Sequence, residues 1–163
     1  MRHNVLGVEI DAITEAEALE RITQFVHEGG PHQVVTANPE ILDNATRNLP
    51  LHYLIRRAAL VTADGQGVLL AGRILGTPFP ARVTGIDLAE ALCRESAERN
   101  ISLYFLGAEP GVVDEAAAKM RQAYPGVKIV GTHHGYFRNE GPAEVLADIM
   151  RTRPDVLLVG MGS

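Results

Sequence analysis

Two apolar runs in this sequence end in Thr-Ala followed by a polar side chain. The first continues as VTANPE over residues 35–40, and the second as VTADGQG over residues 61–67. A carboxylate at such a position can act as a general base that takes a proton from a hydroxyl nucleophile, which makes Asp64 the strongest catalytic candidate. Thr36 and Asn38, in the first run, carry side chains that can hydrogen-bond a polar ligand.

Each of these residues also has a purely structural interpretation. Asp64 precedes a glycine, and an Asp-Gly pair is typical of a turn in which the carboxylate caps the next helix or bonds its own backbone. Asn38 precedes Pro39, a pairing typical of a helix N-cap and the first helical residue, while Thr36 can simply end a strand. The residue types leave both interpretations open.

Two further side chains are candidates for binding. Arg82 lies between Pro80 and Gly85 in an expected loop, where it is either a solvated charge or a clamp for an anion. Tyr136 is either a packing residue or a face on which a flat ring stacks. Only a shared location at the ends of strands favours the functional interpretation of these residues.

The elements that must position these side chains alternate between strand-like and helix-like patterns. Capping signals such as TEAE at residues 14–17 and apolar stripes at helical spacing predict helices between β-branched or apolar runs. Strands separated by helices of this length need crossover connections, so we expect an α/β fold with a mostly parallel sheet and helices on both faces. The expected strands lie at residues 4–10, 32–37, 59–63, 101–108, 127–131 and 155–160.

Composition limits the possible classes of protein. The 163 residues suffice for one domain with a good core but not for two ordinary ones. A net charge of −5 and the absence of a Lys/Arg run argue against a nucleic-acid binder. The single cysteine, Cys93, falls in a helical pattern and is expected to be buried, which fits a reducing cytoplasm. No apolar run approaches the roughly 20 residues that span a bilayer.

The expected strand ends predict a ligand that carries phosphate. They are rich in glycine and small polar residues, and the helix starts near Pro39, Gly111 and Pro142 offer partial positive charge to an anion. In open α/β sheets, ligands bind at this carboxyl edge. The ends read TAN, TADGQG, LGAEPG, GTHHGYF and GMGS.

Several common motifs for phosphate or metal are missing from the sequence. There is no P-loop, and the DGQG turn lacks the third glycine of a dinucleotide fingerprint. No Asp-x-Asp pair is present to hold a divalent metal, and adjacent His133 and His134 would face opposite ways in a strand. We therefore expect a site that needs neither a metal nor another cofactor.

The motifs together resemble those of the WecG/TagA/CpsF glycosyltransferases, in the same order and over nearly the whole chain. The resemblance implies a Rossmann-like α/β domain and an inverting transfer of N-acetylmannosamine, or a related sugar, from a UDP-sugar to N-acetylglucosamine linked through diphosphate to a polyprenyl lipid. Such products are precursors of teichoic acid and other bacterial surface polysaccharides. The motifs are TANPEIL (36–42), ADGQGVLLAGRILG (63–76), RVTGIDL (82–88), YFLGAEPGV (104–112), GYF (135–137) and DVLLVGMGS (155–163).

The resemblance also implies roles for the candidate residues. Asp64 would be the catalytic base, Thr36 and Asn38 would bind the sugar, and Arg82 would help to hold the donor. Gly135 and Tyr136 would contact the nucleotide, as implied by the resemblance.

Relatives in this family continue beyond the last motif, with a basic segment thought to reach the membrane. We therefore expect a single catalytic domain over residues 1–163 that lacks the family's C-terminal segment, which puts the activity of this chain in question. The full-length protein would act in the cytoplasm, peripherally at the inner face of the bacterial plasma membrane. A last strand at residues 156–159 without a covering helix is expected to promote oligomerisation.

Two other functions remain open. The first is a noncatalytic domain that binds nucleotide sugars, although pure binding does not require a base such as Asp64. The second is a nicotinamide-dependent oxidoreductase, against which the incomplete glycine fingerprint and the lack of an acidic residue for the ribose both argue.

Overall fold

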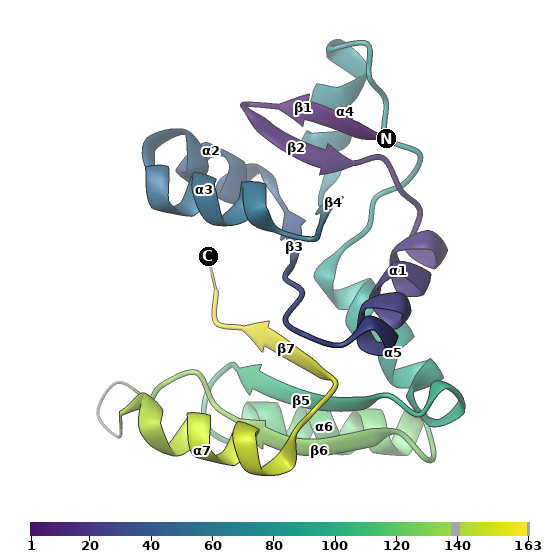
Figure 1. Cartoon of the computed structure of the whole chain (residues 1–163), viewed down its shortest axis with the longest axis vertical. Coiled ribbons are helices and arrows are strands. Elements are labelled where there is room, and N and C mark those ends of the chain that lie inside the picture. The colour runs from purple at the N-terminus through teal and green to yellow at the C-terminus, as the bar shows by residue number, and fades with distance from the viewer. Residues whose placement is uncertain (138–140, 163) are drawn as a thin grey trace. The chain divides into compact units, whose positions relative to one another are not determined.

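The computed structural model describes residues 1–137 and 141–162, and its contacts divide the chain into two compact units (Figure 1). The first unit comprises Met1–Leu88 and the second Ala89–Gly162. The boundary falls inside helix α5 (Gly85–Arg99). Each unit is described by itself. Ser163, the last residue of the GMGS motif, lies outside the described residues.

The first unit opens with an antiparallel hairpin of β1 (Arg2–Val5) and β2 (Val8–Asp11). The turn between them consists of Leu6 and Gly7, both with positive φ (53° and 84°), as a two-residue hairpin of the right twist requires. Residues 4–10, which the sequence predicts to form one strand, therefore belong to two strands of a hairpin.

Helix α1 (Glu15–Glu28) begins at the predicted capping box. The Thr14 hydroxyl accepts from the Glu17 backbone N–H at 3.3 Å, and the Glu17 carboxylate accepts from the Thr14 backbone N–H at 2.8 Å. The bond from the Thr14 backbone N–H, and then a second from the Thr14 hydroxyl at 2.8 Å, lower the pKa of the Glu17 carboxyl. The helix ends at Gly29 and buries its apolar stripe.

Strands β3 (Val34–Ala37) and β4 (Leu60–Ala63) form a parallel pair that holds the two Thr-Ala sequences in register. The crossover consists of two helices, α2 (Pro39–Arg47) and α3 (Leu49–Arg57), where the sequence predicts a helix only from Pro39. Helix α4 (Gln66–Ile74) follows β4. The core of this unit lies between the hairpin, the parallel pair and these helices.

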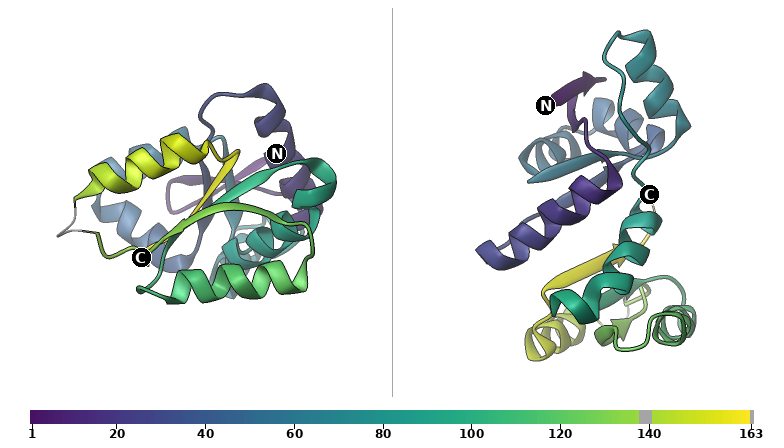
Figure 2. Two further views of the ribbon diagram at one scale, coloured as in Figure 1. Left: turned by 90° about the horizontal axis from the view of Figure 1, so that it is seen from below. Right: turned by 90° about the vertical axis from the view of Figure 1, so that its right-hand side faces the viewer.

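The second unit is a parallel sheet with strand order β6-β5-β7, built from β5 (Ser102–Gly107), β6 (Lys128–His133) and β7 (Val156–Gly160). Helix α6 (Val112–Ala123) connects β5 to β6, and α7 (Pro142–Thr152) connects β6 to β7. The two connections run in opposite directions across the sheet, so right-handed crossovers place α6 and α7 on opposite faces, as Figure 2 shows.

The predicted α/β class with parallel strands and helices around them is confirmed. Cys93 is buried, as predicted, and its burial raises the pKa of the thiol to about 11. That residues 1–163 make a single catalytic domain stays a prediction.

Candidate functional site

The carboxyl ends of β3 and β4 form the first group of candidate residues, which we call the β3–β4 mouth. Ala37 and Ala63 are paired in register, and the Asp64 backbone N–H donates to the Ala37 carbonyl at 3.0 Å. Asn38 and Asp64 follow these two alanines directly. The pairing therefore brings Thr36, Asn38 and Asp64 to one edge of the sheet, as the sequence predicts.

Asn38 caps helix α2, as its structural interpretation predicts. Its side-chain oxygen accepts from the Ile41 backbone N–H at 2.8 Å and so caps α2, with Pro39 in the first turn. The amide group of the same side chain still carries two N–H donors. Half-buried at the mouth, Asn38 can cap the helix with its oxygen and offer its nitrogen to a ligand.

Asp64 differs from Asn38 in that its carboxylate takes no part in the fold. Helix α4 begins after Gly65 without a side-chain cap, and in the described part of the chain no hydrogen bond or ion pair engages the Asp64 carboxylate. The residue is half-buried. A carboxylate in this position is available to accept a proton from a substrate.

The two glycines of the DGQG motif have distinct structural roles. Gly65 has φ +96°, a conformation that favours glycine, and it turns the chain from β4 into α4. A Cβ on Gly67 would lie 2.9 Å from Cγ of Pro39, so the lack of a side chain lets the first turns of α4 and α2 approach each other. The motif thus gathers two helix N-termini at the β3–β4 mouth.

The segment before α5 brings a third helix N-terminus to the same mouth. The Val83 backbone N–H donates to the Ala63 carbonyl at 2.9 Å, and the Thr62 hydroxyl donates to the Val83 carbonyl at 3.0 Å. Thr84 caps α5 by accepting from the Asp87 backbone N–H at 3.0 Å. A Cβ on Gly85 would lie 3.2 Å from the Thr36 hydroxyl, so the helix starts against β3.

Arg82 belongs to this segment and is exposed. Its guanidinium Nη2 lies 4.0 Å from Oδ2 of Asp87, and both side chains are accessible to solvent, so the pair contributes little to stability. Arg82 is therefore available to an anion. Thr84 and Gly85, which contact the mouth, were not among the predicted site residues; the Thr-x-x-Asp capping pattern at residues 84–87 is the signal that indicates the start of the helix.

Gly135 and Tyr136 belong to the second unit and form part of what we call the β5–β6 mouth, together with Gly107 and Ala108. The Gly135 backbone N–H donates to the Ala108 carbonyl at 2.9 Å, and a Cβ on Gly135 would lie 3.4 Å from Cα of Gly107. Tyr136 is 66% exposed, so its ring is not part of the core and can stack on a ligand.

The topology of the second unit favours ligand binding at this mouth. Helices α6 and α7 leave β5 and β6 toward opposite faces, and a crevice between carboxyl ends at such a point is where open α/β sheets bind ligands. Gly107 has φ +141°, and its Cβ would lie 2.1 Å from the Gly160 carbonyl oxygen. Because Gly107 has no side chain, the backbones of β5 and β7 can approach each other closely at this edge of the sheet.

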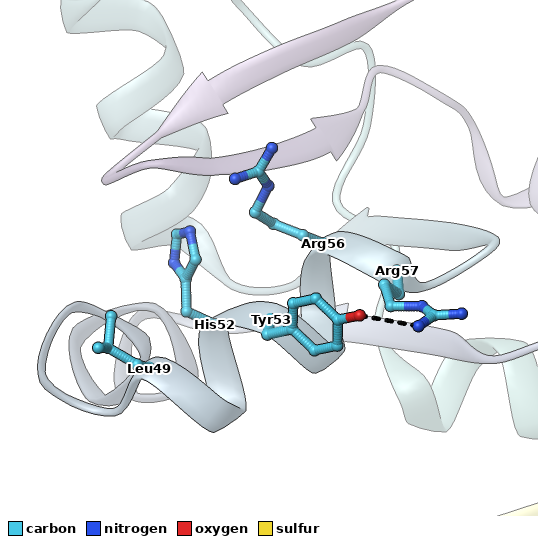
Figure 3. Close-up of a pocket in the computed structure, with 5 residues that line it drawn as sticks. All are labelled: Leu49, His52, Tyr53, Arg56 and Arg57. Atoms are coloured by element: carbon cyan, nitrogen blue, oxygen red, sulfur yellow. Dashed lines mark hydrogen bonds between the residues drawn. The ribbon is translucent and has the colours of Figure 1, made fainter.

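A shallow hollow in the surface lies on one face of helix α3, from Leu49 to Arg57, and not at the ends of the strands (Figure 3). Among the described residues, no group of three or more His, Cys, Asp or Glu side chains is placed to hold a metal. Within the same residues, no helix has both the length and the apolar character needed to cross a membrane. Independence from metal stays a prediction.

Comparison with known proteins shows which family the chain resembles. The model of the glycosyl transferase WecG/TagA/CpsF family matches residues 3–163, which confirms the resemblance found in the motifs. N-acetylglucosaminyldiphosphoundecaprenol N-acetyl-beta-D-mannosaminyltransferase of Staphylococcus aureus (strain NCTC 8325 / PS 47) is 34% identical over 161 residues, 98% of this chain and 63% of that protein. The protein of the same name from strain MRSA252 is 33% identical over 161 residues. The chain thus spans 63% of the length of these curated relatives.

Proposed function

Since the chain belongs to the glycosyl transferase WecG/TagA/CpsF family, we propose that it contributes to the transfer of N-acetylmannosamine, or a related sugar, from a UDP-sugar to a polyprenyl-diphosphate-linked N-acetylglucosamine. The name of the S. aureus relatives supports the choice of the transferred sugar and of the acceptor. The reaction would serve the synthesis of a bacterial surface polysaccharide at the inner face of the plasma membrane.

The free carboxylate of Asp64 carries this proposal. A helix cap or an arginine partner would stabilise the charged form of an Asp and so weaken it as a base, and Asp64 has neither among the described residues. Its backbone is nevertheless fixed by the bond from its N–H to the Ala37 carbonyl. The backbone of Asp64 is thus held in place while its carboxylate stays available to accept a proton, which suits a general base.

In the proposed step, an acceptor hydroxyl oxygen attacks the anomeric carbon of the donor sugar. The new C–O bond forms as the bond between that carbon and the diphosphate breaks, and UDP leaves from the opposite face with the bonding electrons. Asp64 takes the hydroxyl proton. Attack from the face opposite the leaving group inverts the configuration at the anomeric carbon.

The remaining candidate residues would bind the substrates. Thr36 and the amide nitrogen of Asn38 would hydrogen-bond hydroxyl groups of the sugar, and Arg82 would help to hold the donor through its diphosphate. The N-termini of α2, α4 and α5, which converge on the β3–β4 mouth, favour negative charge there. In the second unit, Gly135 would let the nucleotide approach the backbone, and Tyr136 would stack on the base.

The proposal is tested by a calorimetric titration of the chain with UDP, with NAD in parallel, followed by an assay of UDP release from UDP-N-acetylmannosamine in the presence of the lipid-linked acceptor. We expect binding of UDP without binding of NAD, and release that depends on the acceptor. Binding of UDP without any release would instead indicate a noncatalytic nucleotide-sugar binding domain. Binding of NAD alone would overturn the proposal.

A further inference from the structure

The outward face of α3 combines apolar and cationic side chains in one stripe. Its residues recur at positions i, i+3, i+4, i+7 and i+8, which is the spacing of a single helical face. The opposite side of the helix packs inward through Ile55, which is buried. The outward face, drawn in Figure 3, consists of Leu49, His52, Tyr53, Arg56 and Arg57; four of these are exposed, and His52 is half-buried beside Gly7.

The charge of this face is opposite to that of the whole chain. The chain carries a net charge of −5, yet helix α3 contains two arginines and neither Asp nor Glu. Arg56 and Arg57, at the end of α3, therefore have no acidic side chain in their own segment that could neutralise them. This local excess of positive charge favours an anionic partner.

The two large apolar members of the face are exposed. Leu49 is 80% exposed and Tyr53 58% exposed. A stable core does not benefit from leucine and tyrosine side chains in this position. They are of the kind that enter the boundary between lipid headgroups and acyl chains.

The arrangement of Tyr53 and Arg57 suits the boundary between lipid headgroups and acyl chains. The Arg57 guanidinium donates to the Tyr53 hydroxyl at 2.8 Å and lies 5.5 Å from the centre of its ring, as the dashed line in Figure 3 indicates. The pair holds a cation at the polar tip of an amphipathic ring. Tyrosine is enriched at membrane interfaces, where arginine can keep its charge among the headgroups.

We propose that the outward face of α3 docks on an anionic phospholipid surface. The choice of a membrane as partner rests on the proposed function, whose acceptor is a membrane lipid. The contact itself is independent of catalysis, because it involves none of the residues at either mouth. A single short helix would bind weakly and reversibly, through headgroup phosphates on the arginines and shallow burial of Leu49 and Tyr53.

The test is co-sedimentation of the chain with vesicles of phosphatidylglycerol or of phosphatidylcholine alone. We expect binding to phosphatidylglycerol that weakens as salt rises, and little binding to phosphatidylcholine. The double variant Arg56→Glu/Arg57→Glu should reduce the partition coefficient by about tenfold or more, since each arginine near an anionic surface contributes to binding. Leu49→Ser should weaken binding while the salt dependence remains.

A matched control reverses two charges in the second unit. Arg94 is exposed on α5 and Lys119 is exposed on α6, so Arg94→Glu/Lys119→Glu changes the net charge equally without touching α3. Equal losses in the two double variants would show that only net charge matters and would overturn the proposal. Circular dichroism of each variant confirms that the comparison is between folded proteins.

Two further results would also overturn the proposal. One is failure of the wild-type chain to bind phosphatidylglycerol vesicles at low salt. The other is dimerisation in sedimentation velocity that Leu49→Ser abolishes, which would assign the face to a second copy of the chain. The UDP titration is independent of these results, so the proposed function can stand where the membrane contact fails.

Discussion

Asp64 and Asn38 follow two paired strands at equivalent points, yet the fold uses only one of the two side chains. Asn38 caps α2 with its oxygen, whereas no such bond to Asp64 occurs among the described residues. The two residues should therefore respond differently to substitution. Loss of the Asn38 side chain should affect stability, while loss of the Asp64 charge should affect the reaction.

Asp64→Asn should leave the affinity for UDP and the stability nearly unchanged while lowering turnover by about 100-fold or more, the usual scale for a general base. The physical reason is that an amide cannot accept the proton from the acceptor hydroxyl. Calorimetry with UDP and the initial rate of UDP release provide the measurements. Turnover close to that of the wild type would remove Asp64 from the mechanism.

Asn38→Ala is the matched comparison for that variant. It removes the N-cap of α2, so the free energy of unfolding should fall by about 1 kcal/mol in urea denaturation. An unchanged stability would contradict the capping role.

Tyr104 and Asp148 make a hydrogen bond whose effect should depend on pH. The Tyr104 ring is fully buried, and its hydroxyl donates to Asp148 Oδ2 at 2.8 Å. The Arg151 guanidinium and then this hydroxyl lower the pKa of Asp148, while burial foremost raises the pKa of Tyr104 to about 12. Asp148 is therefore charged and Tyr104 neutral at physiological pH.

Tyr104→Phe should reduce the free energy of unfolding by about 1 kcal/mol near neutral pH, since a hydrogen bond to a charged group is lost. A carboxyl with a lowered pKa stabilises the fold above its unfolded pKa of about 4, and this contribution disappears as pH falls through the folded pKa. The difference between variant and wild type should therefore shrink in acid. Urea denaturation at several pH values measures it, and a difference that does not vary with pH would contradict the assignment.

Among the elements, β6 packs against β5 through a glycine. Register between the strands shifts after Leu103, so that Tyr104 pairs with Gly131. A Cβ on Gly131 would lie 2.4 Å from Cε2 of the Tyr104 ring. Because this ring is buried and its hydroxyl is bound to Asp148, it has little freedom to move aside.

Gly131→Ala should consequently lower the free energy of unfolding by about 1–3 kcal/mol, the usual cost of overpacking a core. Val130→Ala, at a partly exposed position on the same strand, is the control and should cost about 0.5 kcal/mol. Thermal or urea denaturation compares the two variants. Similar losses in both would mean that the Tyr104 ring yields to the added methyl group.

Elements with local signals could be predicted from the sequence, whereas those set by distant contacts could not. The Thr14 capping box and the Asn38-Pro39 start are determined by neighbouring residues, and both are confirmed. Helix α3 escaped prediction because Asn48 both ends α2 and caps α3, so the two helices read as one segment. The hairpin escaped because its turn uses Leu6-Gly7 in place of the usual Asn-Gly.

The candidate site, like the helices and strands, could be predicted from the sequence only in part. That Thr36, Asn38 and Asp64 share one edge follows from the parallel pairing of two similar runs, which the sequence indicates. That the segment at residues 83–85 closes on this edge depends on the Val83–Ala63 bond, which joins parts of the chain that no local pattern relates. Nor could the sequence reveal that Asp64 leaves α4 uncapped, since an Asp-Gly turn usually supplies that cap.

At the scale of the whole molecule, we predict that transfer does not require a divalent metal. The sequence offers no Asp-x-Asp pair, and helix N-termini and Arg82 provide positive charge for the diphosphate. Transfer measured in excess chelator should equal transfer in untreated buffer. A loss that added magnesium or manganese restores would contradict this prediction.

The order of strands in the second unit also has a consequence for how the protein is made. Strand β5 lies in the middle of its sheet, but β7, which pairs with one of its edges, follows about 50 residues later. At a synthesis rate of roughly 5–20 residues per second, that edge emerges from the ribosome several seconds before its partner exists. Until β7 arrives, the nascent chain carries an open edge of apolar β5, and during that interval it is most exposed to pairing with another chain and most in need of a chaperone.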